Sequence, residues 1–481
     1  MNRRVRHVSS KKKNAKMPKN TAWNLGMILK ARAPTAVRTS AAKDDLLLEL
    51  VQALGKMGSE KIQKDFNELV VEPFSDPDPK PIAGLLPSRE LADDDSKFCT
   101  VTVGGEEVTL HYKEVVPPSP SPPTTMTTTT TTTTVDNDGG IDALLCLHGA
   151  NGSEFSFRHL LPRVATSTGV RCIAFDRPPY GLSSRPTANV GGTSGSGGGG
   201  GGGNGNDNGG FNFVYTPEGQ AELTLALMDA LGVRRAALLG HSAGAPVALD
   251  AALAAPRRVP SLILVAPAVF VGDPPTDNDE DTGKRGRGGG GGLRLPLDRA
   301  LRFAWFRFLI SQDAPGLNVV RGVVNRQRTA IEEGRMYADL APDVKEAYLR
   351  PTKAEGWDQG LLQLFRGGGF GGGDGGERLR AAMPALTTTQ AGGTASSTAA
   401  TIIIGSKDKT TPPALAAGLR DAMRDAGVDV RYEQMPAAAH LPMEEEAGGV
   451  REDFEAIVVD VVSEAAAAAA AAAPSSLAAP E

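Results

Sequence analysis

Short apolar segments alternate with longer helical segments through the middle and the end of this chain. Six apolar runs have the length of a strand: Ala143–Leu147, Val170–Phe175, Ala236–Leu239, Ser261–Val265, Thr401–Ile404 and Val428–Gln434. Helices are expected between the earlier runs, at Phe155–Thr166, Pro217–Leu231 and Gly244–Ala254. Apolar strands joined by helical crossovers are typical of a sheet buried on both faces. The sequence therefore predicts an α/β fold with a mostly parallel sheet and helices on both faces.

Two further strands are expected before this pattern begins. Phe98–Val103 and Glu107–Val115 are rich in Val, Thr and Tyr, and Gly104-Gly105 separates them. Such a pair is typical of a β-hairpin. Upstream, Leu46–Val71 has helical periodicity, and we assign residues 44–90 to an N-terminal helical extension.

Low-complexity tracts interrupt the order of strands and helices. They account for the high content of 57 Gly residues. Residues 117–138 are rich in Pro and Thr and residues 188–210 in Gly, so we expect both to be disordered insertions. The core is then assigned to residues 91–270 and 385–464, and residues 465–481 form an Ala-rich tail.

Residues 271–384 separate two expected sheet strands and are too many for a loop. Helices are expected at Leu297–Ile310 and Arg326–Leu340, so we predict a helical lid inserted above the sheet. Its aromatic side chains fit either an apolar acyl-binding pocket or ordinary core packing: Trp305, Phe306, Phe308 and Trp357.

The first 43 residues are basic, contain Ser and Thr, and have no Asp or Glu before Asp44. This composition is typical of an organelle transit peptide, although a disordered basic tail is the simpler alternative. We predict a chloroplast location, with the mitochondrion or the cytoplasm as alternatives.

Charge and hydropathy argue against several classes of partner. The net charge of -5 gives no overall attraction to nucleic acid, and no apolar run reaches the ~18 residues that a membrane span needs. Cys99, Cys146 and Cys172 match no zinc-binding spacing and read as small apolar residues. We expect neither a metal nor an organic cofactor, and the oligomeric state stays open.

The motif that carries chemistry is Gly240-His241-Ser242-Ala243-Gly244. It lies between an expected strand and an expected helix, where a G-x-S-x-G sequence makes a sharp turn that exposes the serine hydroxyl. The two glycines remove Cβ atoms where strand and helix crowd together. We predict that Ser242 is a nucleophile and that the side chain of His241 points away from it.

A serine nucleophile needs a base, and the base needs an orienting carboxylate. His440 is the only histidine after Ser242, and it follows an expected strand. Asp408 comes one strand-helix unit earlier, also at the end of a strand, with Asp273 as the alternative acid. We predict a Ser242–His440–Asp408 triad. The acidic run Glu444–Glu446 is expected to begin the next helix.

An acyl-transfer site also needs donors for the developing oxyanion. The sequence His148-Gly149-Ala150 closes the first long strand of the sheet. We predict that the backbone N–H groups of Ala150 and Ala243 are these donors, and that His148 supports the loop by hydrogen bonding.

Together with these motifs, the segment Phe175-Asp176-Arg177-Pro178-Pro179-Tyr180-Gly181 resembles the turn that follows a core strand in the α/β-hydrolase superfamily. Within it, the chain looks most like plant and algal hydrolases that carry plastid-targeting leaders. The resemblance spans residues 91–463 without the insertions. Pro179 stands where such turns usually have Gly or Ala. This difference affects the expected shape of the turn and not the expected fold.

The resemblance implies the α/β-hydrolase fold and a serine hydrolase that cleaves a small-molecule or lipid carboxylic ester through an acyl-enzyme. The same triad serves C–C bond hydrolysis, amide hydrolysis and perhydrolysis, which remain alternatives. A ligand-binding protein without activity is the third hypothesis.

Overall fold

The structure is a computed structural model, and it describes residues 82–117, 140–186, 212–271, 306–307, 309–333, 340–368, 375–387 and 397–471. Several predicted segments lie outside these ranges: the transit peptide, the helix at Leu46–Val71, the insertions at 118–138 and 188–210, Asp273, and the end of the Ala-rich tail. The chloroplast location therefore stays a prediction.

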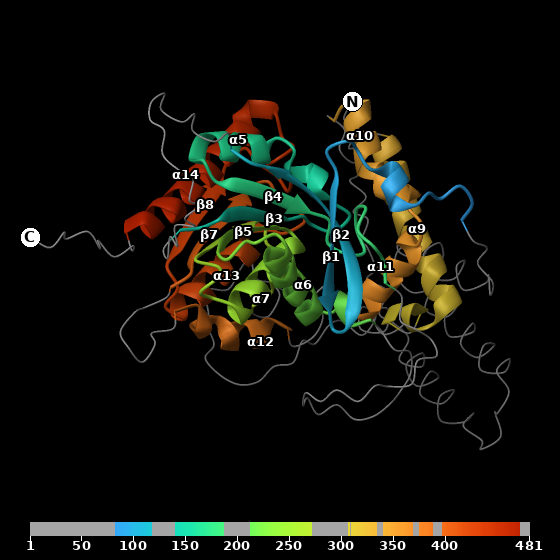
Figure 1. Cartoon of the computed structure of the whole chain (residues 1–481), viewed down its shortest axis with the longest axis horizontal. Coiled ribbons are helices and arrows are strands. Elements are labelled where there is room, and N and C mark those ends of the chain that lie inside the picture. Colours follow the sequence, from blue (N-terminus) through green and yellow to red (C-terminus); the bar gives the residue numbers. More distant parts are fainter. Residues whose placement is uncertain are drawn as a thin grey trace, which may run out of the picture. The chain divides into compact units, whose positions relative to one another are not determined.

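Eight strands form one sheet in the order β1-β2-β4-β3-β5-β6-β7-β8 (Figure 1). The strands are β1 Lys97–Val103, β2 Glu106–Val115, β3 Ala143–Leu147, β4 Arg171–Phe175, β5 Ala236–His241, β6 Ser261–Val265, β7 Ala399–Gly405 and β8 Val430–Met435. β1 and β2 form the predicted hairpin, and β2 pairs antiparallel with β4. All later neighbours pair in parallel, so the predicted mostly parallel sheet is confirmed.

Successive side chains of a strand point to opposite faces of the sheet, so the apolar strands make both faces apolar. Helices cover both of these faces. On one face, Leu145 and Leu238 pack with apolar residues of α6 (Pro217–Ala230), α7 (Gly244–Ala254) and α13 (Pro413–Asp425). On the other face, Leu144 and Ala237 pack with α5 (Leu160–Thr168) and α14 (Val450–Ala471), as Figure 1 shows. The central strands β3, β5 and β6 are buried at every residue, which explains their largely apolar sequences, whereas β8 at the edge of the sheet is partly exposed.

The helix predicted at Phe155–Thr166 begins later than expected. A 3-10 turn, η3 (Glu154–Phe157), comes first, and α5 starts at Leu160. Pro162 then falls in the first helical turn, where its missing N–H costs no hydrogen bond.

Helices are inserted between β6 and β7, and they extend differently from the prediction. α9 (Asp313–Glu332) begins well before the expected Arg326 and ends before Leu340, with Pro315 in its first turn. α10 (Pro342–Leu349), η6 (Arg350–Lys353) and α11 (Trp357–Arg366) follow. Of the helix predicted at Leu297–Ile310, only residues 306, 307, 309 and 310 are described, and they are helical.

The last inserted helix, α12 (Gly375–Ala382), is part of the core rather than of a lid. Leu379 of α12 and Met383 and Leu386 of η7 (Met383–Thr387) are buried in the cluster that contains α7. α9 and α11 instead share a separate apolar cluster with Tyr180 and Tyr215. The lid predicted at residues 271–384 therefore includes, at its end, a segment that packs with α7 against one face of the sheet.

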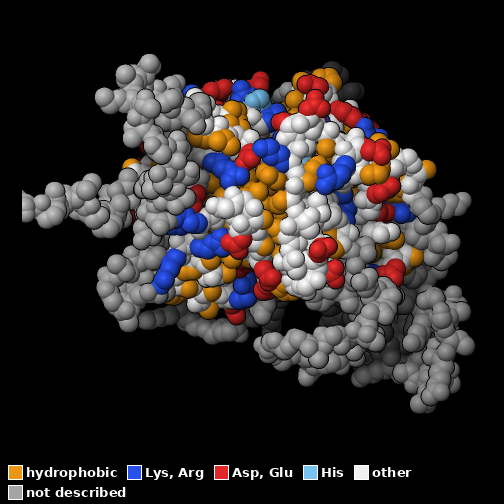
Figure 2. All heavy atoms as spheres, in the orientation of Figure 1, with side chains coloured by type: hydrophobic (Ala, Val, Ile, Leu, Met, Phe, Trp, Pro, Cys, Tyr) orange, Lys and Arg blue, Asp and Glu red, His pale blue; other side chains and the backbone are white. Residues whose placement is uncertain are grey.

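The described residues include no helix that is long and apolar enough to cross a membrane. On the face of the molecule shown in Figure 2, acidic and basic side chains are interspersed. Cys146 and Cys172 are buried in β3 and β4, while Cys99 is partly exposed.

Candidate active site

Ser242 lies in the tight turn between β5 and α7. Its φ angle is 50°, which places a non-glycine residue in the left-handed region. A Cβ on Gly240 would lie 2.6 Å from the carbonyl oxygen of Gly244, and a Cβ on Gly244 would lie 2.3 Å from that of Leu147. Both glycines are therefore required by the close approach of β5, α7 and β3, as the motif predicted.

His440 and Asp408 meet Ser242 at the same edge of the sheet. The Nε2 atom of His440 lies 3.2 Å from Oγ of Ser242, and its Nδ1 atom lies 2.8 Å from Oδ2 of Asp408. Asp408 follows β7 and His440 follows β8, so parallel strands bring together residues far apart in the chain. The separation of Ser242 and His440 is at the long end of the range for a hydrogen bond.

The hydrogen bonds define the tautomer of His440. Because a carboxylate only accepts, Nδ1 carries the proton that is donated to Asp408, and Nε2 is free to accept from Ser242. Asp408 also accepts hydrogen bonds from the Thr410 and Thr411 amides and from the Thr411 hydroxyl. Burial opposes ionisation of Asp408, but the hydrogen bonds from His440 and Thr411 outweigh it and hold its pKa below the ordinary value.

Two carboxylates that the sequence did not reveal hold the loop that carries His440. Glu445 accepts hydrogen bonds from the amides of Ala439 and Leu441, on either side of His440. Glu444 forms a bidentate ion pair with Arg158. The expectation that Glu444–Glu446 begins a helix was wrong, because α14 begins only at Val450. Gly448 and Gly449, both with positive φ, precede that helix.

His241 contributes a third restraint on the same loop. Its Nε2–H donates to the carbonyl oxygen of His440 at 2.9 Å, since a carbonyl can only accept. Burial, and next the nearby charge of His440, lower the pKa of His241 to about 3. His241 is therefore neutral at physiological pH and supports the backbone of His440.

His148 is likewise neutral and structural. It donates from Nδ1 to the carbonyl oxygen of Gly149 at 2.7 Å, and its Nε2 accepts from the amide of Arg177 at 3.0 Å. Burial, and next the charge of Arg177, lower its pKa to about 3. The Arg177 guanidinium donates in turn to the carbonyl oxygen of His148, which ties the turn after β4 to the loop after β3.

The amides of Ala150 and Ala243 remain available as donors. Within the described part of the chain, neither N–H is hydrogen-bonded to another protein group. Gly149 lets the two loops approach, since a Cβ there would lie 3.0 Å from Cβ of Ser242. Both amides thus belong to the loops that meet at the serine.

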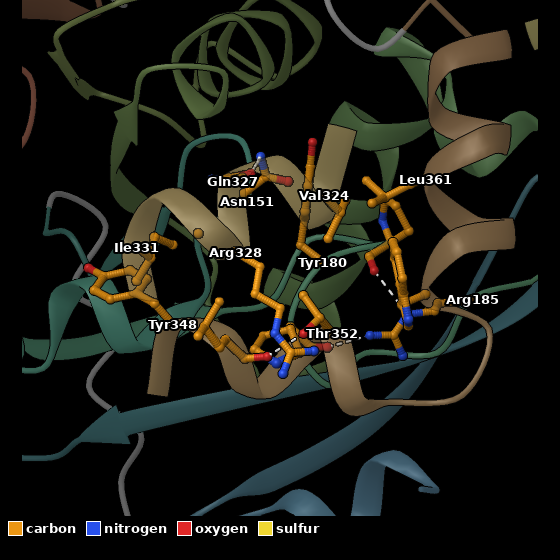
Figure 3. Close-up of a pocket in the computed structure, with 16 residues that line it drawn as sticks. Asn151, Tyr180, Arg185, Val324, Gln327, Arg328, Ile331, Tyr348, Thr352 and Leu361 are labelled. Atoms are coloured by element: carbon orange, nitrogen blue, oxygen red, sulfur yellow. Dashed lines mark hydrogen bonds between the residues drawn. The ribbon is translucent and has the colours of Figure 1, made fainter. Parts of the chain in front are cut away.

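A pocket adjoins this loop junction (Figure 3). Asn151 and Gly152, which directly follow Ala150, line one side of it, and the inserted helices line the other. Asn151 donates to the side chain of Gln327 on α9 at 2.7 Å, so the loop and the insertion are linked at the rim. A second, open depression borders His440 and is lined by Lys407, Lys409, Thr410 and Ala439.

No cluster of three or more His, Cys, Asp or Glu side chains suited to a metal occurs among the residues that the structure describes. The residues that meet at Ser242 have the arrangement expected of a nucleophile, a base and an orienting carboxylate. Such an arrangement is suited to transfer of an acyl group.

Comparison with known proteins agrees with the topology. Residues 142–288 match the family described as alpha/beta hydrolase fold. The chain has the α/β-hydrolase fold, as the resemblance predicted. An uncharacterized hydrolase, YugF, of Bacillus subtilis (strain 168) is 28% identical over 132 residues, which cover 27% of this chain and 39% of that protein. The match thus spans about two fifths of that relative's length.

Solved structures with this fold are similar at low sequence identity. The haloalkane dehalogenase DatA from Agrobacterium tumefaciens C58 is 19% identical, with a TM-score of 0.47, over 76% of this chain and 98% of that chain. The loop variant DbeA-M1 of a haloalkane dehalogenase from Bradyrhizobium elkanii is 19% identical, with a TM-score of 0.46, over 79% of this chain and 100% of that chain.

Proposed function

We propose that this α/β-hydrolase-fold protein is a serine hydrolase that cleaves a carboxylic ester. The observation that carries the proposal is the hydrogen-bonded chain from Ser242 through His440 to Asp408. A buried carboxylate that fixes the histidine tautomer, with a serine hydroxyl hydrogen-bonded to the same histidine, is suited to nucleophilic catalysis.

The reaction then proceeds in two half-reactions. Oγ of Ser242 bonds to the carbonyl carbon while Nε2 of His440 takes the hydroxyl proton. The negative charge that develops on the carbonyl oxygen is stabilised by the N–H groups of Ala150 and Ala243. Collapse of the intermediate breaks the C–O bond, and His440 gives the proton to the departing alcohol.

Water completes the second half-reaction. His440 takes a proton from the water as its oxygen bonds to the acyl carbon, and the proton returns to Oγ of Ser242 when the acid leaves. Throughout, Asp408 stays ionised and stabilises the protonated imidazole, and its lowered pKa suits this role.

The identity of the nucleophile favours a carbonyl substrate over an alkyl halide. If Ser242 displaced a halide from a saturated carbon, the product would be an ether, which water does not cleave. An acyl-serine ester, in contrast, is hydrolysed by the same groups that formed it. Amide and C–C bond hydrolysis proceed through the same acyl-enzyme and are the second candidate reactions.

A fluorophosphonate probe tests the proposal on the full chain. The intact protein should be labelled, and Ser242→Ala should not be. Ser406→Ala is the matched control, because Ser406 is exposed and its hydroxyl contacts Gln434 rather than the triad. Equal labelling of the intact protein and Ser242→Ala, or no labelling of the intact protein, would contradict the proposal.

A further inference from the structure

Two buried hydrogen-bond donors in the pocket beside Ala150 have no partner. The hydroxyl of Tyr180 and Nε1 of Trp357 belong to side chains that are each 6% exposed. Neither atom is hydrogen-bonded within the described residues, and both side chains line the pocket. A buried unpaired donor is costly, so these two groups suit a ligand that brings an acceptor. Figure 3 shows Tyr180 among the labelled pocket side chains, with Tyr348 and Arg185 on opposite sides.

The hydroxyl of Tyr180 can act only while it is protonated. Burial raises the pKa of Tyr180 above its ordinary value, so the group is a donor throughout the physiological range. Its ring lies nearly perpendicular to the imidazole of His148, with centroids 5.5 Å apart. Tyr180 therefore connects the pocket to the loop that carries Ala150.

The charge of the pocket favours an anionic acceptor. Its described lining contains Arg185 and Arg328 but no Asp or Glu. Arg185 donates to three main-chain carbonyls and to the Ser88 hydroxyl, which are all neutral groups. Burial lowers the pKa of Arg185 to about 10, so it stays charged at neutral pH. Arg328 pairs with Glu332 outside the lining, in an exposed ion pair.

The remaining walls are apolar. Val324 and Ile331 of α9 and Leu361 of α11 line the pocket. Gly360 allows α11 to lie against the turn after β4, because a Cβ there would be 2.6 Å from Cβ of Pro179. The pocket thus combines aliphatic surface with donors and positive charge.

We propose that this pocket binds the acyl chain of an ester that also carries a carboxylate, as in a monoester of a dicarboxylic acid. The methylene groups contact Val324, Ile331 and Leu361, and the carboxylate accepts hydrogen bonds from Tyr180 and Trp357. This proposal rests on the proposed ester hydrolysis and adds the substrate class.

Binding to the full-length Ser242→Ala protein tests the pocket without turnover. Monomethyl adipate and methyl hexanoate have the same ester and the same chain length, and they differ by a terminal carboxylate. Isothermal titration should give a Kd about tenfold or more lower for monomethyl adipate, which is the range of one hydrogen bond to a charged group. Dimethyl adipate, which keeps the oxygen without the charge, should bind more weakly than the monoester.

Single substitutions test which side chains produce the preference for the carboxylate. Tyr180→Phe and Trp357→Phe, each made in the Ser242→Ala protein, should reduce the preference for monomethyl adipate about tenfold. Tyr215→Phe is the matched control, because the Tyr215 hydroxyl is also buried and unpaired but does not line the pocket. Equal binding of all three ligands, or the same loss in Tyr215→Phe as in Tyr180→Phe, would overturn the proposal.

The outcome is separable from that of the proposed function. If the fluorophosphonate does not label the intact protein but the carboxylate preference and its loss in Tyr180→Phe are observed, the result supports the binding pocket and contradicts ester hydrolysis. If Ser242 is labelled but the carboxylate preference is absent, the proposed substrate class is contradicted and the proposed serine hydrolase is supported.

Discussion

The imidazole of His241 donates a hydrogen bond to the main-chain carbonyl of His440, with 2.9 Å between Nε2 and the oxygen. The residue before Ser242 thus holds the backbone of His440, 199 positions later in the chain. The rings of the two histidines are 5.1 Å apart. This contact couples the turn at Ser242 to the loop after β8, so we expect the separation of Ser242 and His440 to depend on it.

His241→Ala should lower kcat about tenfold and leave KM nearly unchanged. The loss of one hydrogen bond of about 1 kcal/mol frees the loop, and small displacements of a base are costly to catalysis. The separate effects on kcat and KM are measured by steady-state kinetics with an ester that the intact protein hydrolyses. His241→Gln, whose amide can still donate to the carbonyl, should retain most of kcat. A change confined to KM, or equal loss in both variants, would show that the contact does not position His440.

Thr411→Val should shift the titration profile of the Asp408 carboxyl group, followed by carbon-13 NMR, to higher pH by up to about one unit. The Thr411 hydroxyl donates to Asp408 and helps to hold the pKa of that carboxyl below its ordinary value. Asp408 is ionised above its pKa and becomes protonated as the pH falls through it. A higher pKa therefore makes Asp408 lose its charge at a higher pH. Thr411→Ser, which keeps the hydroxyl, should have the profile of the intact protein. An unchanged profile in Thr411→Val would contradict this role.

Gly244→Ala should destabilise the fold by roughly 1–3 kcal/mol, the usual range for overpacking. The added Cβ would lie 2.3 Å from the carbonyl oxygen of Leu147 and 2.7 Å from that of His148. Gly418→Ala is the control, since a Cβ at that position in α13 meets nothing within 4 Å. Removing a glycine from a helix should stabilise the protein slightly. Urea unfolding of both variants decides whether the close approach at Gly244 is required.

Glu154→Gln should flatten the dependence of stability on pH between about pH 4 and 7. Burial, and next the charge of Asp176, raise the pKa of Glu154 to about 7, whereas an unfolded Glu titrates near ~4.3. In this window the folded protein holds a proton that the unfolded chain has released, so stability falls as the pH rises. The contribution is of the order of 1–3 kcal/mol.

Melting temperatures from pH 5 to pH 8 test the role of Glu154. The melting temperature of the intact protein should decrease more steeply with pH than that of Glu154→Gln, and the variant should be the more stable protein at pH 8. Parallel curves for the two proteins would contradict the assignment.

The sequence by itself determined the fold and the three residues that meet at its edge. Strands buried on both faces consist mainly of apolar residues, so β3 and β6 were recognisable with their bounds. The elbow at Ser242 was recognisable because only glycine fits at Gly240 and Gly244. Asp408 and His440 followed from their places after successive parallel strands, which end at one edge of the sheet.

Only the tertiary structure decided what supports these residues. The contacts of Glu445 and His241 with the His440 loop join groups whose relation depends on loop geometry, and the sequence of a loop does not specify it. The same holds for the pocket, where Tyr180 and Trp357 come from the turn after β4 and from an inserted helix. Periodicity predicts which side of one element is buried, because that is a local property. Which distant side chains share a cavity is decided by packing.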